Sequence, residues 1–261
     1  MEKILRSRQS RVLIVTINDP ATRNALNWDI YDGLREAIDE AASDPGIGAV
    51  VLTGAEGFFS SGGNLHGLKE RSEADYATRR SSVDRLHRMI LAMRTCPKPI
   101  IAAIEGGAAG AGASTATACD LIVSARGSYL SVAYVKIGLT PDGGITAFLG
   151  SAIPRQLLAE MVFTGDRIPA ERLHAAGVIN RVVEPGEALA AALELAARLA
   201  DGPGQALGAG KRLIDQARLN ELTAQLDLEA EGIATALGGE EGREGINAFL
   251  EKRKPDFRNQ S

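Results

Sequence analysis

The chain has 261 residues, of which 24% are charged and 45% hydrophobic, and its formal net charge at pH 7 is -4. This length can bury a substantial core, and the balanced charge argues against a polybasic nucleic-acid-binding protein or an acidic disordered chain. The two cysteines, Cys96 and Cys119, are too few for a disulfide scaffold, so we expect a reducing, cytoplasmic location.

Neither a targeting segment nor a membrane-spanning helix is predicted. The basic N-terminus is not followed by the apolar run of a signal peptide. The most apolar stretch, residues 100–118, contains Glu105 and several glycines, whereas a spanning helix needs about 20 mostly apolar residues. The three histidines lack the spacing of zinc ligands, so we expect no metal site.

The first half of the chain alternates between expected strands and expected helices. Runs rich in β-branched residues predict strands at 12–17, 47–53, 100–104 and 121–124. Apolar residues at helical spacing predict helices at 27–43, 73–94 and 111–118. Asn27 stands where the first helix needs an N-cap. The continuous apolar character of 47–53 indicates a strand that is buried on both faces.

Helices predominate in the last third. Segments 154–164 and 169–176 begin with proline and are followed by glycine, as helix ends prefer, and a short strand is expected at 178–183. Further helices are expected at 187–200, after Pro203, from Thr223 and at 242–254. The alternation predicts an α/β core at 1–195 and a helical C-terminal part at 196–261, which together form one functional unit.

Two glycine-rich loops are the main candidates for a ligand site. Ser60–Leu65 and Gly106–Gly112 each follow an expected strand, and the second also opens the expected helix at 111–118. Glycine lets a ligand approach bare backbone N–H groups, and a helix N-terminus adds free donors, so such loops can hold an oxyanion. Tight helix–strand packing without function is one alternative. A dinucleotide-binding fingerprint is another, but Thr115 replaces its third glycine.

Asp142 is the candidate acidic group, because Pro141 and Gly143 hold it on a loop from which it could approach a ligand. A turn or N-cap aspartate is the ordinary alternative, and the residues alone favour it. Tyr134 is either a donor or pocket wall, or a packed core residue. Ser114 is either a polar group of the site or an ordinary helix residue. The run 249–255 ends in cations that suit a helix C-terminus or a phosphorylated ligand.

These pieces together resemble the crotonase superfamily, the enoyl-CoA hydratase/isomerase family, along nearly the whole chain. Arg23-Asn24-Ala25-Leu26 resembles the early motif beside the CoA adenine. Ser60–Leu65 and Gly106–Gly112 resemble the two oxyanion loops. Residues 165–183 resemble the stretch in which an Ala-Gly-Val pattern leads to a strand, and 249–255 resemble the C-terminal signature.

The resemblance implies a crotonase-type spiral of ββα units whose helical C-terminal part forms a trimer or a dimer of trimers. The substrate would be an acyl-CoA thioester, with no separate cofactor. Its carbonyl oxygen would accept hydrogen bonds from the N–H groups of Gly63 and Ala111, which would stabilise an enolate. The other implied substrate or CoA contacts are Arg23, Ala25, Ser61, Asn64, Leu65, Ser114, Tyr134, Phe249 and Lys252, of which Arg23 and Lys252 would meet phosphate.

The chain departs from the family pattern at two positions that determine which reaction is catalysed. Typical hydratases of the family carry two glutamates at positions that correspond here to Ser114 and Tyr134, neither of which can replace a carboxylate base near neutral pH. Asp142 matches a position where some isomerases, ring-isomerising enzymes and a dehalogenase carry a catalytic carboxylate. The dehalogenase surrounds it with aromatic residues, which make up only 4% of this chain. We therefore expect an isomerase that moves a proton with Asp142. A hydratase or lyase with atypical residues and a catalytically silent acyl-CoA-binding protein remain alternatives.

Overall fold

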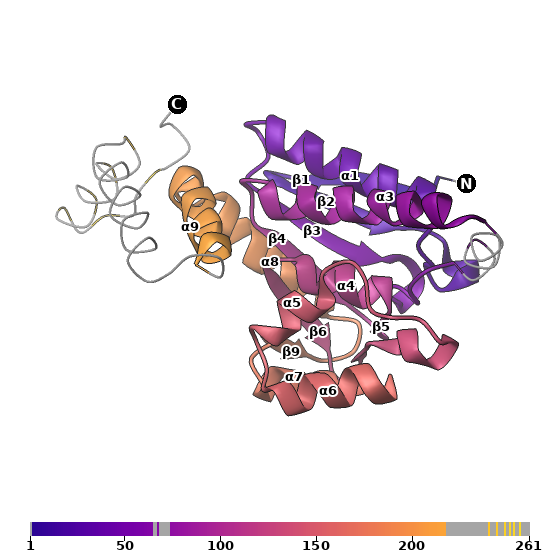
Figure 1. Cartoon of the computed structure of the whole chain (residues 1–261). Coiled ribbons are helices and arrows are strands. Elements are labelled where there is room, and N and C mark those ends of the chain that lie inside the picture. Colours follow the sequence, from indigo (N-terminus) through magenta and orange to yellow (C-terminus); the bar gives the residue numbers. More distant parts are fainter. Residues whose placement is uncertain are drawn as a thin grey trace.

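The computed structural model describes residues 2–64, 67 and 74–217, and the single positions 240, 244, 248, 251, 253 and 256. Within these residues the chain forms a six-stranded sheet, in the order β1-β2-β3-β4-β6-β9, and a three-stranded sheet, in the order β5-β7-β8 (Figure 1). In the larger sheet β1 is antiparallel to β2, and the pairings from β2 to β9 are parallel. The α/β class expected from the sequence is confirmed.

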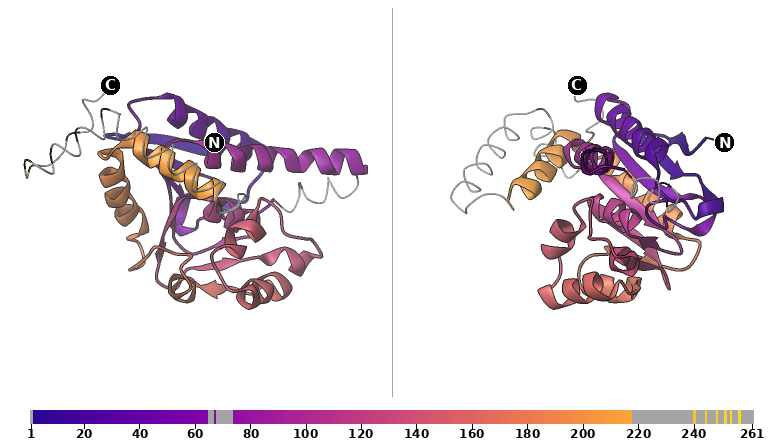
Figure 2. Two further views of the ribbon diagram at one scale, coloured as in Figure 1. Left: turned by 60° about the vertical axis from the view of Figure 1, so that its left-hand side comes forward. Right: turned by 45° about the vertical axis from the view of Figure 1, so that its right-hand side comes forward.

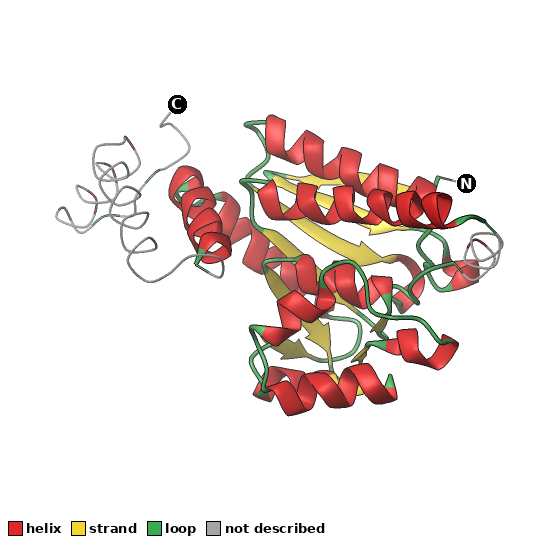
Figure 3. Cartoon of the chain, viewed as in Figure 1, coloured by secondary structure: helices red, strands yellow, loops and turns green. Residues whose placement is uncertain are grey.

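Helices enclose the strands on both sides (Figure 3). The strands are β1 (Ile4–Gln9), β2 (Val12–Ile17), β3 (Ala49–Gly54), β4 (Ile100–Ile104), β5 (Ala108–Ala109), β6 (Leu121–Ala125), β7 (Tyr129–Ser131), β8 (Ile168–Pro169) and β9 (Arg181–Val183). The α-helices are α1 (Trp28–Ser43), α3 (Tyr76–Thr95), α4 (Ala111–Ala118), α5 (Ile145–Gly150), α6 (Arg155–Thr164), α7 (Ala170–Ala175), α8 (Ala188–Ala200) and α9 (Gly204–Gln216). Short 3₁₀ helices are η1 (Pro20–Thr22), η2 (Ala55–Gly57) and η3 (Ala133–Ile137).

Helix α1 forms where its sequence predicts it. The side chain of Asn27 accepts a hydrogen bond from the N–H of Ile30, which satisfies one of the free donors of the first turn. The apolar residues at helical spacing form one buried stripe: Ile30, Leu34, Ala37, Ile38 and Ala41. Asp44 ends the helix. Capping and burial therefore both determine the position of α1, which runs beside α3 along one face of the large sheet (Figure 1).

The central strand β3 is buried on both faces, as its apolar run predicts. Val50 and Leu52 point into the larger core cluster with α1 and α3, while Ala49 and Val51 belong to a second cluster with α8. Because successive side chains of a strand point to opposite faces, this alternation is the expected arrangement for a sheet covered twice. Two further views show α6 and α7 at the end of the molecule that lies away from α1 and α3 (Figure 2).

Most expected elements are present, with shifted ends. The strands expected at 47–53 and 178–183 are observed at Ala49–Gly54 and Arg181–Val183, whereas those at 12–17 and 100–104 match. The sequence did not predict β1 or the short strands of the three-stranded sheet. The helices expected from Thr223 and at 242–254 lie outside the continuously described residues. The division into 1–195 and 196–261 stays a prediction, and residue 195 lies within α8.

None of the helices in the described residues is long and apolar enough to cross a membrane.

Candidate active site

The two glycine-rich loops lie against each other. The N–H of Ser60 donates to the carbonyl of Gly107 (3.3 Å), and the N–H of Ala109 donates to the carbonyl of Ser60 (3.0 Å). Gly62 (φ +98°) needs to be glycine, because an added Cβ would lie 2.7 Å from the carbonyl oxygen of Ala109. The backbones of two segments that are distant in sequence are therefore in direct contact.

The backbone donors expected to hold an oxyanion are left unused by the fold. Around Gly63, the N–H of Leu26 donates to Gly62 (2.7 Å) and the N–H of Asn64 donates to Leu26 (2.9 Å), so this bridge does not use the N–H of Gly63. Ala111 is the first residue of α4, where N–H groups have no partner within the helix. In the described part of the chain, neither of these two N–H groups has an acceptor.

Ser114, Tyr134 and Asp142 converge from α4, η3 and the loop before α5. The hydroxyl of Tyr134 donates to Oδ1 of Asp142 (2.7 Å), and the hydroxyls of Ser114 and Tyr134 are 2.9 Å apart. The hydroxyl of Ser114 also lies 2.9 Å from the backbone carbonyl of Asp142. An ionised carboxylate only accepts hydrogen bonds, so the single proton of the tyrosine points to Asp142 while Asp142 is charged.

Burial gives the three side chains different roles. Ser114 is fully buried and Tyr134 is 8% exposed, while Asp142 is half-buried. Burial, together with the nearby charge of Asp142 and the hydrogen bond to it, raises the pKa of Tyr134 above its ordinary value. Tyr134 is therefore a neutral hydrogen-bond donor at neutral pH. The alternative that Asp142 caps a helix is not supported, because α5 begins after Gly144 without a side-chain cap.

Two glycines bring the three-residue cluster to the oxyanion loops. Gly143 has φ +61°, and an added Cβ would lie 2.8 Å from Cβ of Ser114, so glycine lets the Asp142 loop lie against α4. A Cβ added at Gly110 would be 3.9 Å from both Cα of Gly62 and Cζ of Tyr134. Gly110 therefore lies between the first glycine loop and the cluster.

The motif at 23–26 holds the first glycine-rich loop in place through hydrogen bonds of Asn24. Asn24 is fully buried, and its amide donates to the carbonyls of Ala55 (2.9 Å) and Phe58 (2.5 Å) while its Oδ1 accepts from the N–H of Asp19 (2.9 Å). The carbonyl of Asn24 also accepts the hydroxyl of Ser60 (2.8 Å). Asn24 was not predicted from the sequence to be a residue of the site. The signal that could have indicated it is a polar residue within the motif at 23–26.

The other residues that the resemblance implies as substrate or CoA contacts differ in their exposure to solvent. Ser61 is exposed, with its N–H donating to the carbonyl of Arg23 (2.9 Å), and Ala25 is buried beside this contact. Arg23 is exposed, and its guanidinium carbon lies 5.7 Å from the centre of the Phe58 ring. Asn64 follows Gly63 on the same loop. Leu65, Phe249 and Lys252 lie outside the described residues.

Potential metal ligands and nucleophiles do not add to this site. Among the described residues there is no group of three or more His, Cys, Asp or Glu side chains that could hold a metal ion. Cys96 and Cys119 are both buried and free, and burial raises the pKa of each thiol. They behave as small core residues, as the sequence predicted. The groups that the described residues bring together here are backbone donors and the Asp142 carboxylate.

Comparison with known proteins identifies the family of this arrangement. The family model described as enoyl-CoA hydratase/isomerase matches residues 7–260. The chain belongs to this family. It is 34% identical to the 2,3-dehydroadipyl-CoA hydratase of Escherichia coli (99% of both chains covered) and 34% identical to the 1,2-epoxyphenylacetyl-CoA isomerase of the same organism (98% of both chains).

Solved structures agree with this assignment. The crystal structure of an enoyl-CoA hydratase from Polaromonas sp. JS666 superposes with a TM-score of 0.95 at 41% identity, covering 97% of this chain and 98% of that one. The crotonase fold expected from the resemblance is thus confirmed. An enzyme of the enoyl-CoA hydratase/isomerase family processes acyl-CoA thioesters, and hydratases and isomerases both occur among the relatives of this chain.

Proposed function

We propose that this family member is an enoyl-CoA isomerase that moves a proton with Asp142. The observation that carries the proposal is the hydrogen bond of 2.7 Å from the Tyr134 hydroxyl to the Asp142 carboxylate. It links the one carboxylate of the cluster to the residue that replaces a hydratase glutamate. Because Ser114 and Tyr134 stay neutral, Asp142 is the group of this cluster that can exchange a proton near pH 7.

The proposed reaction uses backbone donors for charge and one side chain for proton transfer. The thioester carbonyl oxygen accepts hydrogen bonds from the N–H groups of Gly63 and Ala111, which stabilise the dienolate that forms when a proton leaves the α or γ carbon. Asp142 takes this proton and returns it to the other carbon. One carboxylate is sufficient, because it acts first as base and then as acid. Tyr134 holds the carboxylate in place through its hydrogen bond.

The test is the Asp142→Asn variant with a panel of 2-enoyl, 3-enoyl and ring-bearing acyl-CoAs. Asparagine keeps the shape and can still accept the hydrogen bond of Tyr134, so acyl-CoA binding stays intact while isomerisation, followed by ultraviolet absorption of the conjugated thioester, is lost. The matched control is Asp166→Asn, because Asp166 is exposed and pairs with Lys136 on the surface. Full turnover of the true substrate by Asp142→Asn excludes the proposed shuttle.

A hydratase or lyase with atypical residues is the second candidate, because relatives and solved neighbours of similar identity are named hydratases. Crotonyl-CoA separates the two reactions, since hydration removes the conjugated double bond and isomerisation creates or moves it. A chain that binds CoA esters but turns over no member of the panel would instead be a catalytically silent acyl-CoA-binding protein.

We further propose a cytoplasmic homotrimer or dimer of trimers that needs no separate cofactor. The family likeness supports the assembly. Sedimentation of the purified chain gives its mass in solution, and a monomer at micromolar concentration contradicts this part of the proposal.

A further inference from the structure

Helix α4 carries three hydroxyl side chains, and one of them has its shortest contacts outside the helix. The hydroxyls of Thr115 and Thr117 donate to the backbone carbonyls four residues earlier, at 2.8 and 2.9 Å, as hydroxyls within a helix often do. The hydroxyl of Ser114 lies 3.3 Å from the corresponding carbonyl. Its shorter contacts, of 2.9 Å each, are with the hydroxyl of Tyr134 and the backbone carbonyl of Asp142.

The number of protons shows what the Ser114 hydroxyl holds. Each hydroxyl has one proton, and that of Tyr134 points to the charged carboxylate of Asp142 (2.7 Å). The nearest acceptors for the proton of Ser114 are therefore the Tyr134 oxygen and the backbone carbonyl of Asp142. Both belong to the segment 134–142, so in either orientation the Ser114 hydroxyl attaches this segment to α4.

The same helix carries a backbone donor of the proposed oxyanion site. Ala111 begins α4, Ser114 follows three residues later, and all eight residues of the helix are buried. The N–H of Ser114 donates to the carbonyl of Gly110 (3.0 Å), which belongs to the same peptide group as the N–H of Ala111. One rigid element thus holds both the Ala111 donor and the hydroxyl that attaches the Asp142 segment.

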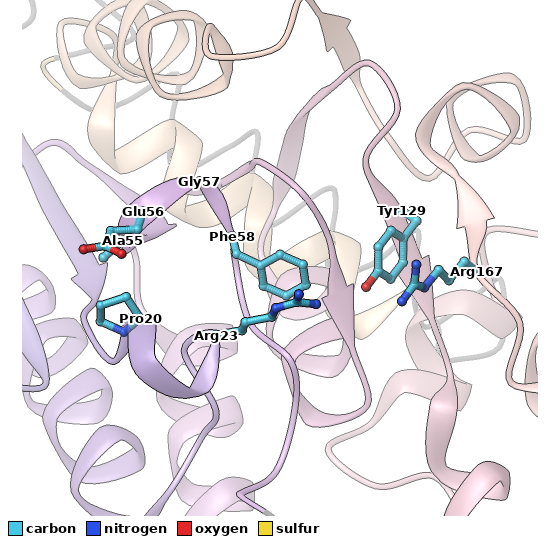
Figure 4. Close-up of a pocket in the computed structure, with 8 residues that line it drawn as sticks. All are labelled: Pro20, Arg23, Ala55, Glu56, Gly57, Phe58, Tyr129 and Arg167. Carbon is cyan, nitrogen blue, oxygen red and sulfur yellow. The ribbon is translucent and has the colours of Figure 1, made fainter.

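Ser114 itself is fully buried, so it has no exposed surface through which it could contact a ligand. The implied phosphate contact Arg23 lies elsewhere, at a cavity of about 350 Å³ that is also lined by Phe58, Tyr129 and Arg167 (Figure 4). None of the three residues of the cluster lines this cavity. A change at Ser114 therefore leaves the implied CoA contact at Arg23 unaltered.

We propose that Ser114 is a positioning residue that fixes Asp142 relative to the Ala111 donor. The proposal rests on the proposed proton shuttle, in which the thioester oxygen is held at Ala111 while Asp142 reaches the α or γ carbon. The Ser114 hydroxyl sets the separation of these two groups without contacting the substrate. A misplacement of about 1 Å can cost about a hundredfold in rate. A substrate contact at Ser114 would instead act mainly on substrate binding.

The experiment is steady-state kinetics of Ser114→Ala with the acyl-CoA of the panel that wild type turns over fastest. We expect kcat to fall about tenfold to a hundredfold, while KM changes less than about twofold. The matched control is Ser128→Ala. Ser128 is also buried, and its hydroxyl contacts the Ser124 hydroxyl (2.6 Å) and the carbonyl of Ala125 (2.7 Å), none of which belongs to the cluster. Its kcat should stay within about twofold of wild type.

A spectroscopic measurement distinguishes a displaced Asp142 from a damaged helix. Hydrogen bonds from Gly63 and Ala111 polarise the carbonyl of a bound conjugated acyl-CoA, which shifts its ultraviolet absorption to longer wavelength. We expect Ser114→Ala to keep this shift, because the backbone of α4 keeps its own hydrogen bonds. Lost turnover with an unchanged shift then locates the defect at Asp142.

The proposal is overturned if kcat of Ser114→Ala equals that of Ser128→Ala, if only KM rises, or if the absorption shift disappears together with kcat. Ser114→Cys keeps the size and a weak donor, so its kcat should lie between those of wild type and Ser114→Ala. It replaces an alanine variant that fails to fold, and a cysteine variant as active as Ser128→Ala then overturns the proposal.

The Asp142→Asn variant separates this proposal from the proposed function. Full turnover by Asp142→Asn contradicts the proposed function, and the role of Ser114 with it. An inactive Asp142→Asn beside a fully active Ser114→Ala contradicts the role of Ser114 alone.

Discussion

Replacing Asn24 by alanine tests whether this buried amide holds the loops of the site together. The variant loses three hydrogen bonds, to Ala55, Phe58 and Asp19. At about 1 kcal/mol for each bond, this loss amounts to about 3 kcal/mol. Alanine is also disfavoured at φ +58°, which adds about 1 kcal/mol. We therefore expect Asn24→Ala to lower the free energy of unfolding by about 4 kcal/mol.

Asn24→Gly separates the two contributions. Glycine loses the same hydrogen bonds but adopts positive φ without steric cost, so it should be about 1 kcal/mol more stable than the alanine variant. Asn18→Ala is the control, because the Asn18 side chain donates one exposed bond, to the carbonyl of Glu2 (2.9 Å), and its loss should cost at most about 1 kcal/mol.

Urea unfolding, followed by circular dichroism at a single protein concentration, measures these differences, since association would otherwise add to the apparent stability. Asn24→Ala within about 1 kcal/mol of wild type would show that the loops do not depend on this amide. A glycine variant no more stable than the alanine variant would refute the backbone part of the reasoning.

Three further outcomes follow from the geometry. Gly143→Ala should reduce turnover strongly, measured as kcat on the acyl-CoA panel, because its Cβ would collide with Ser114 and shift Asp142; unchanged kcat contradicts this. Because the pKa of Tyr134 is raised in the folded chain, the unfolded chain loses this proton first. The free energy of unfolding should therefore fall above about pH 10, less steeply in Tyr134→Phe, as alkaline unfolding curves can show. Lys211→Met breaks a buried ion pair with Asp120 (2.8 Å), which keeps Arg94 as a second partner (3.0 Å), and should cost about 2 kcal/mol in urea unfolding, whereas a loss below about 1 kcal/mol would show that the pair is not needed.

Strong local patterns made much of the fold predictable. The apolar run before Asp19 and the stripe beginning at Ile30 define β2 and α1 without knowledge of the rest of the chain. The first strand, β1, was missed because only its first residue, Ile4, is buried, so it has almost no apolar pattern. The three-stranded sheet was missed because its strands are two or three residues long and exist through pairing between distant segments.

The candidate site was predictable in parts but not as a whole. Glycine composition identified both loops, because close backbone approach requires glycine whatever the fold. The bond between Tyr134 and Asp142, by contrast, depends on the turn that η3 and Gly138 create, and the sequence gives no sign of its geometry. Arg23 and Arg167 line one cavity although they are far apart in the sequence, so local patterns could not predict that they lie near each other.

The double covering of the large sheet has a consequence for the newly made chain. Val51, Ile101 and Val123 belong to the second core cluster, whose helical members among the described residues come from α8, and α8 is synthesised long after these strands. Domains generally fold as units during synthesis, and apolar strand surface exposed before completion favours aggregation. A nascent chain that ends before residue 188 would therefore present one apolar face of its sheet to the solvent, and a chaperone that shields extended apolar segments would bind there until the ribosome releases α8.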